Sequence, residues 1–212
     1  MEAQFIIRQA EFVTSAGVGG NYPAPLPCEI AIVGKSNVGK SSLINRLANN
    51  HKLAKTSAQP GKTRLINFFL LNREAYLVDL PGYGFAKASK AEQKSWGELL
   101  ERYLSSGRVK HLLLLLDIRH APTRDDLQMF RYLLYYGIPY TLVATKADKI
   151  AVSKRRQEAS ARAKELGAPP FAIPFSSETG DGKAELLERI GQIVRDCTVR
   201  EAGSSEEDSS GE

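Results

Sequence analysis

The chain has 212 residues, of which 42% are hydrophobic and 25% are charged, and its formal net charge is +5. This balance is ordinary for a soluble globular protein and excludes a wholly disordered chain, while the longest aliphatic run, 112–116, is too short to cross a bilayer. The two cysteines, at 28 and 197, have neither zinc-site nor disulfide-framework spacing, so we expect a reducing, cytoplasmic compartment.

In chain order, a mixed N-terminal segment and a Gly- and Pro-rich connector at 17–27 precede the predicted strands and helices. Six strands are expected, at 29–33, 64–71, 75–79, 111–117, 140–145 and 171–175. Between them apolar residues repeat with helical spacing, as Trp96, Leu99 and Tyr103 do. Alternating strands and helices predict an α/β fold with a mostly parallel, doubly wound sheet. Pro174 is tolerated only at an edge, so the last strand should be an outer one.

Composition changes along the chain define its expected units. We expect an N-terminal extension at 1–28 packed on the main domain, the main domain at 29–198, and an acidic tail at 199–212 that is disordered for lack of large apolar residues. The last twelve residues hold five acids and no base, so the other 200 residues carry a net charge of +10. A body this basic predicts a polyanionic partner such as nucleic acid; a protein that is merely basic is the alternative.

Directly after the predicted strand 29–33 comes Gly34-Lys35-Ser36-Asn37-Val38-Gly39-Lys40-Ser41, which matches the phosphate-binding pattern G-x-x-x-x-G-K-[ST]. Its glycines let backbone N–H groups wrap a phosphate chain, and the helix that follows adds the positive end of its dipole. Lys40 is expected to reach the β- and γ-phosphates, and the Ser41 hydroxyl to bind Mg²⁺. A strand–helix turn without a ligand is the alternative.

Two later segments complete the predicted phosphate site. Asp79-Leu80-Pro81-Gly82 ends the strand 75–79; its acid can hold Mg²⁺ through a water, and the Gly82 N–H can contact a γ-phosphate. The loop 51–64 has four Lys or Arg residues and no acid. Within it, Thr63 is the candidate for a second Mg²⁺-binding hydroxyl, available when the loop closes over a triphosphate. A mobile basic loop without a metal contact is the alternative.

The motif Thr145-Lys146-Ala147-Asp148 closes the strand 140–145 and predicts base recognition. The Asp148 carboxylate can accept from both N1–H and the 2-amino group of guanine, whereas adenine would leave it buried and unpaired. Lys146 can lay its aliphatic stem on the base. Ser176-Ser177-Glu178, after the last strand, is expected to offer backbone N–H groups to the guanine oxygen.

Other polar and aromatic residues leave alternatives open. Asp117, at the end of the strand 111–117, either orients a residue of the phosphate site or forms an ion pair with Arg119. Trp96 is interpreted as a core anchor of its helix, with a partner contact as the alternative. The three histidines, at 51, 111 and 120, do not have the spacing of a metal site.

Together these segments resemble the translation-factor-related P-loop GTPases and, closely, the EngB/YihA/YsxC family of bacterial ribosome-assembly GTPases. The resemblance runs from about residue 5 to 197, and its most specific parts are Pro-Gly-Lys-Thr at 60–63 and Asp-Leu-Pro-Gly-Tyr-Gly at 79–84. It implies a three-layer P-loop GTPase fold, with a mostly parallel six-stranded sheet, one antiparallel edge strand and helices on both faces. Residues 29–198 would then form the GTP-binding domain.

The resemblance also implies the site residues. Lys40, Thr63, Gly82 and Asn37 would contribute to catalysis, and Mg²⁺ would be held by Ser41, by Thr63 and, through a water, by Asp79. The implied contacts of GTP or GDP are Gly34, Lys35, Ser36, Asn37, Val38, Gly39, Lys40, Ser41, Ser42, Gly61, Lys62, Thr63, Arg64, Leu65, Asp79, Leu80, Pro81, Gly82, Thr145, Lys146, Ala147, Asp148, Phe175, Ser176 and Ser177.

For function, the resemblance implies a cytoplasmic GTP/GDP switch that acts in assembly of the large (50S) ribosomal subunit, contacts ribosomal RNA and proteins, and is needed for normal cell division and septation. The oligomeric state is open, with a monomer as the default expectation. Tyr83 stands where Ras-like enzymes have a water-orienting Gln, which predicts slow hydrolysis without a partner. A K⁺ ion near Asn37 is our hypothesis for the missing positive charge, and Arg64 as an arginine finger is the alternative.

Three rival functions remain at this point. An ATP-using P-loop kinase would prefer adenine, against which the motif at 145–148 argues. A non-enzymatic, nucleotide-dependent scaffold is disfavoured because no long coiled coil is visible. A signalling GTPase with a non-ribosomal partner at a membrane is disfavoured because neither a signal peptide nor a lipidation motif is seen, so no membrane partner is expected.

Overall fold

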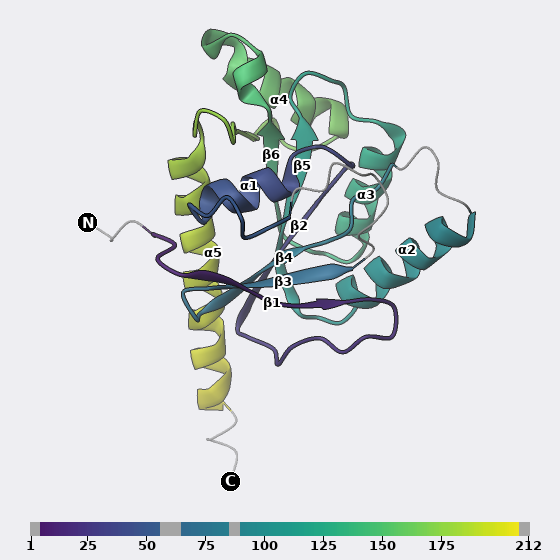
Figure 1. Cartoon of the computed structure of the whole chain (residues 1–212), viewed down its shortest axis with the longest axis vertical. Helices are drawn as coiled ribbons and strands as arrows, with labels where there is room; N and C mark the ends of the chain where they lie inside the picture. Colours follow the sequence, from purple (N-terminus) through teal and green to yellow (C-terminus); the bar gives the residue numbers. More distant parts are fainter. Residues whose placement is uncertain (1–4, 56–64, 85–89, 208–212) are drawn as a thin grey trace.

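The structure is a computed structural model that describes residues 5–55, 65–84 and 90–207. One seven-stranded sheet, in the order β1-β3-β4-β2-β5-β6-β7, lies between helices on its two faces (Figure 1). The strands are β1 (Ala10–Ala16), β2 (Cys28–Gly34), β3 (Ile66–Leu71), β4 (Ala75–Asp79), β5 (Val109–Asp117), β6 (Tyr140–Thr145) and β7 (Ile173–Pro174). The α-helices are α1 (Lys40–Leu47), α2 (Lys90–Leu104), α3 (Arg124–Tyr135), α4 (Arg155–Leu166) and α5 (Lys183–Glu207).

The sheet is mostly parallel, as predicted, but it has one strand more than expected. β2 pairs in parallel with β4 and β5, and β6 and β7 continue this direction, whereas β3 is antiparallel to both of its neighbours. The additional strand, β1, comes from the N-terminal extension and covers β3, which is therefore not at the edge. Only Ala16 of β1 is buried. Because backbone bonds to β3 hold this strand, it lacks the apolar pattern by which the others were predicted.

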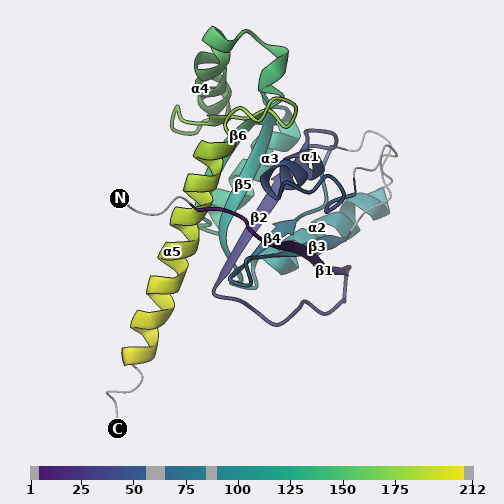
Figure 2. The ribbon, with the colours of Figure 1, turned by 60° about the vertical axis from the view of Figure 1, so that its left-hand side comes forward.

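The two faces of the sheet bury separate groups of side chains. Along β5, Leu112, Leu114 and Leu116 pack with residues of α2, α3 and α4, whereas Leu113 and Leu115 pack with residues of α1 and α5. Figure 2 shows α5 running along its face of the sheet and past its lower end. Helices on both faces explain the unbroken apolar run of β5, since neither side of this strand meets water.

The ends of the chain differ in part from expectation. β7 is an outer strand that pairs only with β6, so the edge position predicted from Pro174 is confirmed. Helix α5 continues to Glu207, whereas the sequence predicted a disordered tail from residue 199; residues 208–212 lie outside the described part. Lengthening a helix that has already formed has a small cost in free energy, because each further residue adds one backbone hydrogen bond that offsets its lost conformational freedom. Among the described residues, no helix is long and apolar enough to cross a membrane.

Buried His111 predicts how stability depends on pH. Its ring lies at the start of β5 with Nε2 2.8 Å from Thr141 Oγ1. Burial, followed by the positive charge of Arg189, lowers the pKa of His111 to about 4. The unfolded chain binds this proton below about pH 6.5, so the free energy of unfolding should fall between pH 6.5 and 4, by at most roughly 3 kcal/mol. Urea unfolding of wild type and His111→Gln at several pH values in this range measures the effect. If the free energy of unfolding changed with pH equally in both proteins, His111 would not be its source.

Candidate nucleotide-binding site

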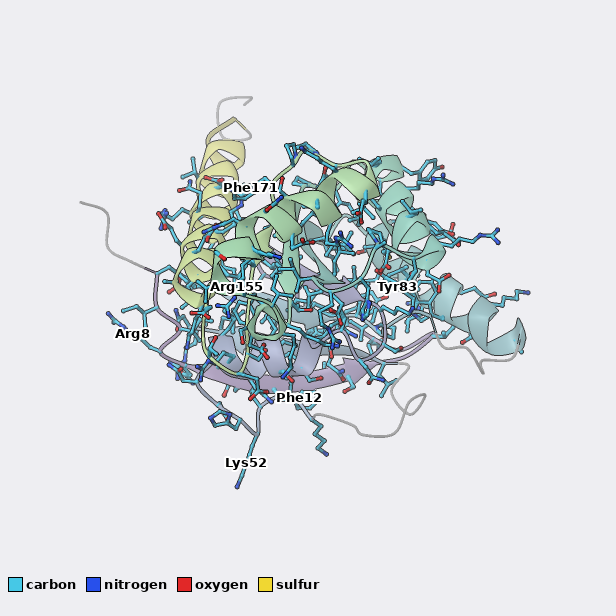
Figure 3. All side chains as sticks on the ribbon, turned by 90° about the horizontal axis from the view of Figure 1, so that it is seen from above. Arg8, Phe12, Lys52, Tyr83, Arg155 and Phe171 are labelled. Atoms are coloured by element: carbon cyan, nitrogen blue, oxygen red, sulfur yellow. The ribbon has the colours of Figure 1, made fainter. Side chains whose placement is uncertain are left out.

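The predicted motifs meet at one edge of the sheet. Residues 34–41 follow β2, residues 79–82 begin at the last residue of β4, Asp117 ends β5, and residues 145–148 begin at the last residue of β6. Since these strands are parallel, their carboxyl ends lie side by side, and ligands of such sheets bind there. Figure 3 looks onto this edge, with Tyr83 among the side chains that gather on it.

The loop 34–41 has the conformation that its spacing predicts. Gly34 is tightly packed: a Cβ there would lie 2.8 Å from Val38 Cγ1 and 2.9 Å from the Leu115 carbonyl oxygen. Gly39 precedes α1 with φ 112°, and Asn37 has φ 64°, in the left-handed region that asparagine tolerates. The loop therefore turns sharply between β2 and α1, whose first residue is Lys40.

The segment after β4 lies directly against this loop. The Ser36 N–H donates to the Tyr83 carbonyl oxygen at 2.9 Å, and Lys35 and Tyr83 form a parallel β-bridge. A Cβ on Gly82 would lie 3.1 Å from Lys40 Nζ and 3.2 Å from the Gly34 carbonyl oxygen. A side chain at this position would be tight against the backbone of residues 34 and 36, so glycine suits this close approach of the segment to the loop.

Asp79 has a buried carboxylate oxygen that could bind a cation. Its Oδ1 atom is buried, lacks a hydrogen-bond partner among the described residues, and lies 3.9 Å from Lys40 Nζ. Burial raises the pKa of Asp79, against the lowering effects of Lys40 and of a hydrogen bond with Asn67. No cluster of three or more His, Cys, Asp or Glu residues occurs in the described part, but Mg²⁺ bound with phosphates needs only one carboxylate and one hydroxyl. Asp79 and Ser41 fit this donor set.

The base-recognition motif is joined to the phosphate loop. The Thr145 hydroxyl donates to the Val38 carbonyl at 2.7 Å and lies 3.1 Å from the Leu116 carbonyl oxygen. Lys146 has φ 61°, and Ala147 N–H donates to the carbonyl of the fully buried Phe175 at 3.1 Å. Thr145 therefore fixes the distance between the expected base and phosphate sites.

Asp148 is held as an ionised acceptor. Ser176 Oγ donates to its Oδ1 atom at 2.8 Å, and Lys149 Nζ lies 3.0 Å from its Oδ2 atom. Desolvation tends to raise the pKa of Asp148, but the bonds from Ser176 and Lys149 outweigh it and leave the pKa below its usual value. Ser176 itself is fully buried. The structure thus brings the two predicted base-recognition segments together.

Asp117 forms the ion pair with Arg119 that was one of the two alternatives, and it also contacts Lys146 of the base-recognition motif. Its carboxylate accepts two bonds from the Arg119 guanidinium, at 2.9 and 2.8 Å, and its Oδ2 atom lies 3.0 Å from Lys146 Nζ. Burial opposes ionisation, but the bonds from Arg119 and Lys146 outweigh it and hold the pKa of Asp117 well below its usual value. Asp117 is therefore an ion-pair partner that also orients the lysine of the base-recognition motif.

Some predicted site residues lie outside the described part of the chain: Gly61, Lys62, Thr63 and Arg64. Their roles, including the Mg²⁺ contact of Thr63 and the arginine-finger alternative, stay predictions. Leu65, the first described residue after them, has an exposed fraction of 39% and directly precedes β3. Trp96, predicted to be a core anchor, is half-buried and packs against the buried side chains on the face of the sheet that α2, α3 and α4 cover.

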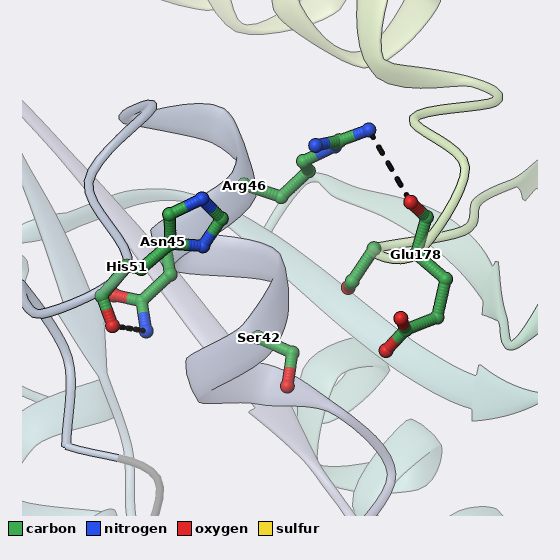
Figure 4. Close-up of a pocket in the computed structure, with 6 residues that line it drawn as sticks. Ser42, Asn45, Arg46, His51 and Glu178 are labelled. Atoms are coloured by element: carbon green, nitrogen blue, oxygen red, sulfur yellow. Dashed lines mark hydrogen bonds between the residues drawn. The ribbon is translucent and has the colours of Figure 1, made fainter.

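A polar pocket of about 250 Å³ adjoins the site between α1 and the loop after β7 (Figure 4). It is lined by Ser42, Asn45, Arg46, His51, Ser177 and Glu178. The sequence analysis did not single out Asn45, Arg46 or His51 as site residues. Asn45 and Arg46 could have been found from their i+3 and i+4 spacing from Ser42. The contact of Arg46 Nη2 with the Glu178 carbonyl, at 3.5 Å, joins residues 132 positions apart and leaves no signal in the sequence.

Known proteins resemble this chain along most of its length. A sequence model of the family described as "50S ribosome-binding GTPase" matches residues 29–146. Proteins named "Probable GTP-binding protein EngB" are 50% identical over 191 residues in Pelotomaculum thermopropionicum, covering 89% of this chain and 96% of that protein, and 49% identical over 192 residues in Clostridium kluyveri, covering 89% and 97%.

Solved structures agree with these sequence relatives. A crystal structure titled as a probable GTP-binding protein engB superposes with a TM-score of 0.65 at 25% identity, covering 80% of this chain and all of that one. The structure of Era in complex with MgGDPNP and nucleotides 1506–1542 of 16S ribosomal RNA gives 0.63 at 26% identity, over 78% of this chain and 56% of that one.

Proposed function

Since this chain belongs to the EngB family of GTP-binding proteins and is a GTPase, we propose that it is a GTP/GDP switch in the assembly of the large ribosomal subunit. The single observation that supports the nucleotide site best is the convergence of residues 34–41, 79–82, 145–148 and 176–177 at one sheet edge, with Thr145 bonded to the Val38 carbonyl. Competition of GTP against ATP tests the proposal, because a P-loop kinase would prefer ATP.

The site divides the work of binding GTP among three groups. Backbone N–H groups at the start of α1, from Gly39 onward, bind the phosphates, since the Ser36 N–H donates to the Tyr83 carbonyl instead. Lys40 neutralises charge on the β- and γ-oxygens. Ser41 and Asp79 would hold Mg²⁺, which as a bound cation draws the phosphate oxygens together and neutralises charge on them. Asp148, kept ionised by Ser176 and Lys149, accepts from the guanine N1–H and 2-amino groups.

The surroundings of Tyr83 support slow intrinsic hydrolysis. Its side chain is buried, and its hydroxyl donates to Asp126 Oδ1 at 2.7 Å, away from the loop 34–41 that its carbonyl contacts. The position that carries a water-orienting amide in Ras-like enzymes therefore supplies none. We infer that a bound partner, a monovalent cation, or both, complete the catalytic site.

We expect hydrolysis to be faster in KCl than in NaCl at equal ionic strength, on the order of tenfold, if a K⁺ ion near Asn37 supplies positive charge to the transition state. Single-turnover GTP hydrolysis in the two salts measures it, and Asn37→Ala should abolish the difference. Identical rates in wild type would remove the hypothesis and leave the partner as the missing element.

Charge and family together support a ribosomal partner. The chain without its last twelve residues carries +10, and Lys52 and Lys55 are exposed beside the site, with Lys52 pointing outward in Figure 3. Further cations at 62, 64 and 87 lie outside the described residues, as does the side chain of Lys90. We propose that this surface contacts ribosomal RNA in the GTP state and that the protein acts as a cytoplasmic monomer. We also propose that it is needed for normal septation because it is needed for ribosome assembly.

Binding to the large subunit should therefore depend on nucleotide and on salt. With about four phosphate contacts, affinity should fall roughly a hundredfold between ~50 and ~200 mM salt, and it should be higher with a non-hydrolysable GTP analogue than with GDP. Co-sedimentation with large-subunit particles measures both effects. Affinity that is flat across salt, or equal for the two nucleotides, would favour the alternatives of a scaffold or a signalling GTPase with another partner.

A further inference from the structure

Tyr83 has a side chain that is anchored in α3 rather than in the nucleotide site. It is 5% exposed, and its hydroxyl donates to Asp126 Oδ1 at 2.7 Å. Asp126 is itself fixed, because its Oδ2 atom accepts from the Thr123 N–H at 2.7 Å and from the Thr123 hydroxyl at 2.6 Å in the capping box of α3. Both carboxylate oxygens thus have partners, and the tyrosine is tied to a rigid helix end.

The main chain of the same residue is anchored in the phosphate loop. The Tyr83 carbonyl accepts from both the backbone N–H and the hydroxyl of Ser36, at 2.9 and 3.1 Å. One residue thereby bridges α3 and the loop 34–41, and the backbone between its two anchors has little freedom. Gly82, directly before it, lies so close to Lys40 Nζ that an added Cβ would be 3.1 Å away.

A third contact holds the same segment from α2. The Trp96 Nε1–H donates to the Pro81 carbonyl at 3.0 Å, and the Trp96 and Tyr83 rings meet edge-to-face with centroids 6.2 Å apart. Helices α2 and α3 therefore both fix the segment 81–83 on the phosphate loop. None of these side-chain contacts involves an atom that a nucleotide would touch in the arrangement described above.

We propose that Tyr83 is a positioning residue for the γ-phosphate: its bond to Asp126 holds the Gly82 N–H ready on the phosphate loop, and this raises affinity for GTP relative to GDP. The inference rests on the proposed placement of the γ-phosphate beside Gly82. A preorganised donor binds more tightly because its ordering does not oppose binding. GDP lacks the group that the Gly82 N–H would contact, so its affinity should not depend on the anchor.

The test is Tyr83→Phe, which removes only the hydroxyl. Affinity for a non-hydrolysable GTP analogue should fall about 5- to 30-fold, and affinity for GDP should change less than about twofold. The matched control is Tyr103→Phe, because Tyr103 is also buried and its hydroxyl also donates to a buried carboxylate, Glu29 Oε2, at 2.7 Å. Glu29 lies near the start of β2, at the opposite end from the site, so this variant should leave the GTP-to-GDP ratio unchanged.

An equal loss of affinity for both nucleotides in Tyr83→Phe, or no loss for either, would overturn the inference. If this variant does not fold, Trp96→Phe addresses the same segment, since it removes the N–H that donates to Pro81; an unchanged GTP-to-GDP ratio there would overturn it equally. Lys40→Ala distinguishes failure of the proposed phosphate site from failure of the positioning role of Tyr83. If Lys40→Ala binds GTP normally, the phosphate site is misplaced; if it does not, while Tyr83→Phe is unchanged, only the positioning role fails.

Discussion

Asp148→Asn should reverse the base preference of the protein, with affinity for GTP reduced about a hundredfold or more and affinity for XTP correspondingly increased. The carboxylate accepts from two donors of guanine, and asparagine retains only one acceptor and adds a donor. Xanthine carries an oxygen where guanine has its 2-amino group, so it matches the amide. Sites built on buried hydrogen bonds discriminate steeply, because a mismatch leaves polar groups unpaired.

The surroundings of Asp148 allow this substitution, because the partly exposed Lys149 ammonium group, 3.0 Å from Oδ2, can turn away from the new amide nitrogen. Ser176 Oγ, 2.8 Å from Oδ1, can still donate to the asparagine oxygen. Asp181→Asn is the control, because Asp181 lies in the loop after β7 that also carries Ser176, but it bonds to Thr179 and Arg155. Competition of GTP and XTP for each variant measures the preference. If Asp148→Asn kept the preference of wild type for guanosine, the purine would have to lie elsewhere.

Lys40→Ala should reduce affinity for GTP by about a hundredfold or more. The ammonium group lies 3.9 Å from Asp79 Oδ1 and beside Gly82, where it is the cation nearest to the expected β- and γ-oxygens. Its loss removes a charge-assisted bond to phosphate and also leaves the buried Asp79 carboxylate without its compensating charge. The second effect should raise the pKa of Asp79 further, which weakens its fitness to hold Mg²⁺.

Fluorescent-nucleotide titration measures the affinity of Lys40→Ala, and thermal unfolding with and without GTP separates binding from stability. Lys164→Ala, which removes an exposed charge from the last turn of α4, is the control for net charge. Wild-type affinity in Lys40→Ala would show that the triphosphate does not lie on 34–41. A variant that is unstable without nucleotide but regains wild-type stability with GTP would contradict the prediction in the same way.

Much of the site was predictable because its determinants are local. Residues 34–41 are contiguous, their spacing sets the turn between β2 and α1, and the same holds for Thr145-Lys146-Ala147-Asp148 after β6. Placing these motifs at strand ends required only the alternation of strands and helices, since parallel strands bring their carboxyl ends to one edge. The role of Asp117 could not be decided in this way, because its contact with Lys146 depends on how β5 and β6 lie relative to each other.

By itself, the sequence predicted which residues would bind phosphate, Mg²⁺ and guanine, and determined in what order they follow buried strands. Only the tertiary structure decided how they are held: Tyr83 is anchored on Asp126, 43 residues away, and Thr145 on Val38, 107 residues away. It also decided that β1 covers β3 as a seventh strand. The physical reason is the same in each case. Hydrogen bonds between distant segments leave no local pattern in the sequence. Helices and strands do leave one in the spacing of apolar residues, and tight turns leave one in the positions of glycines.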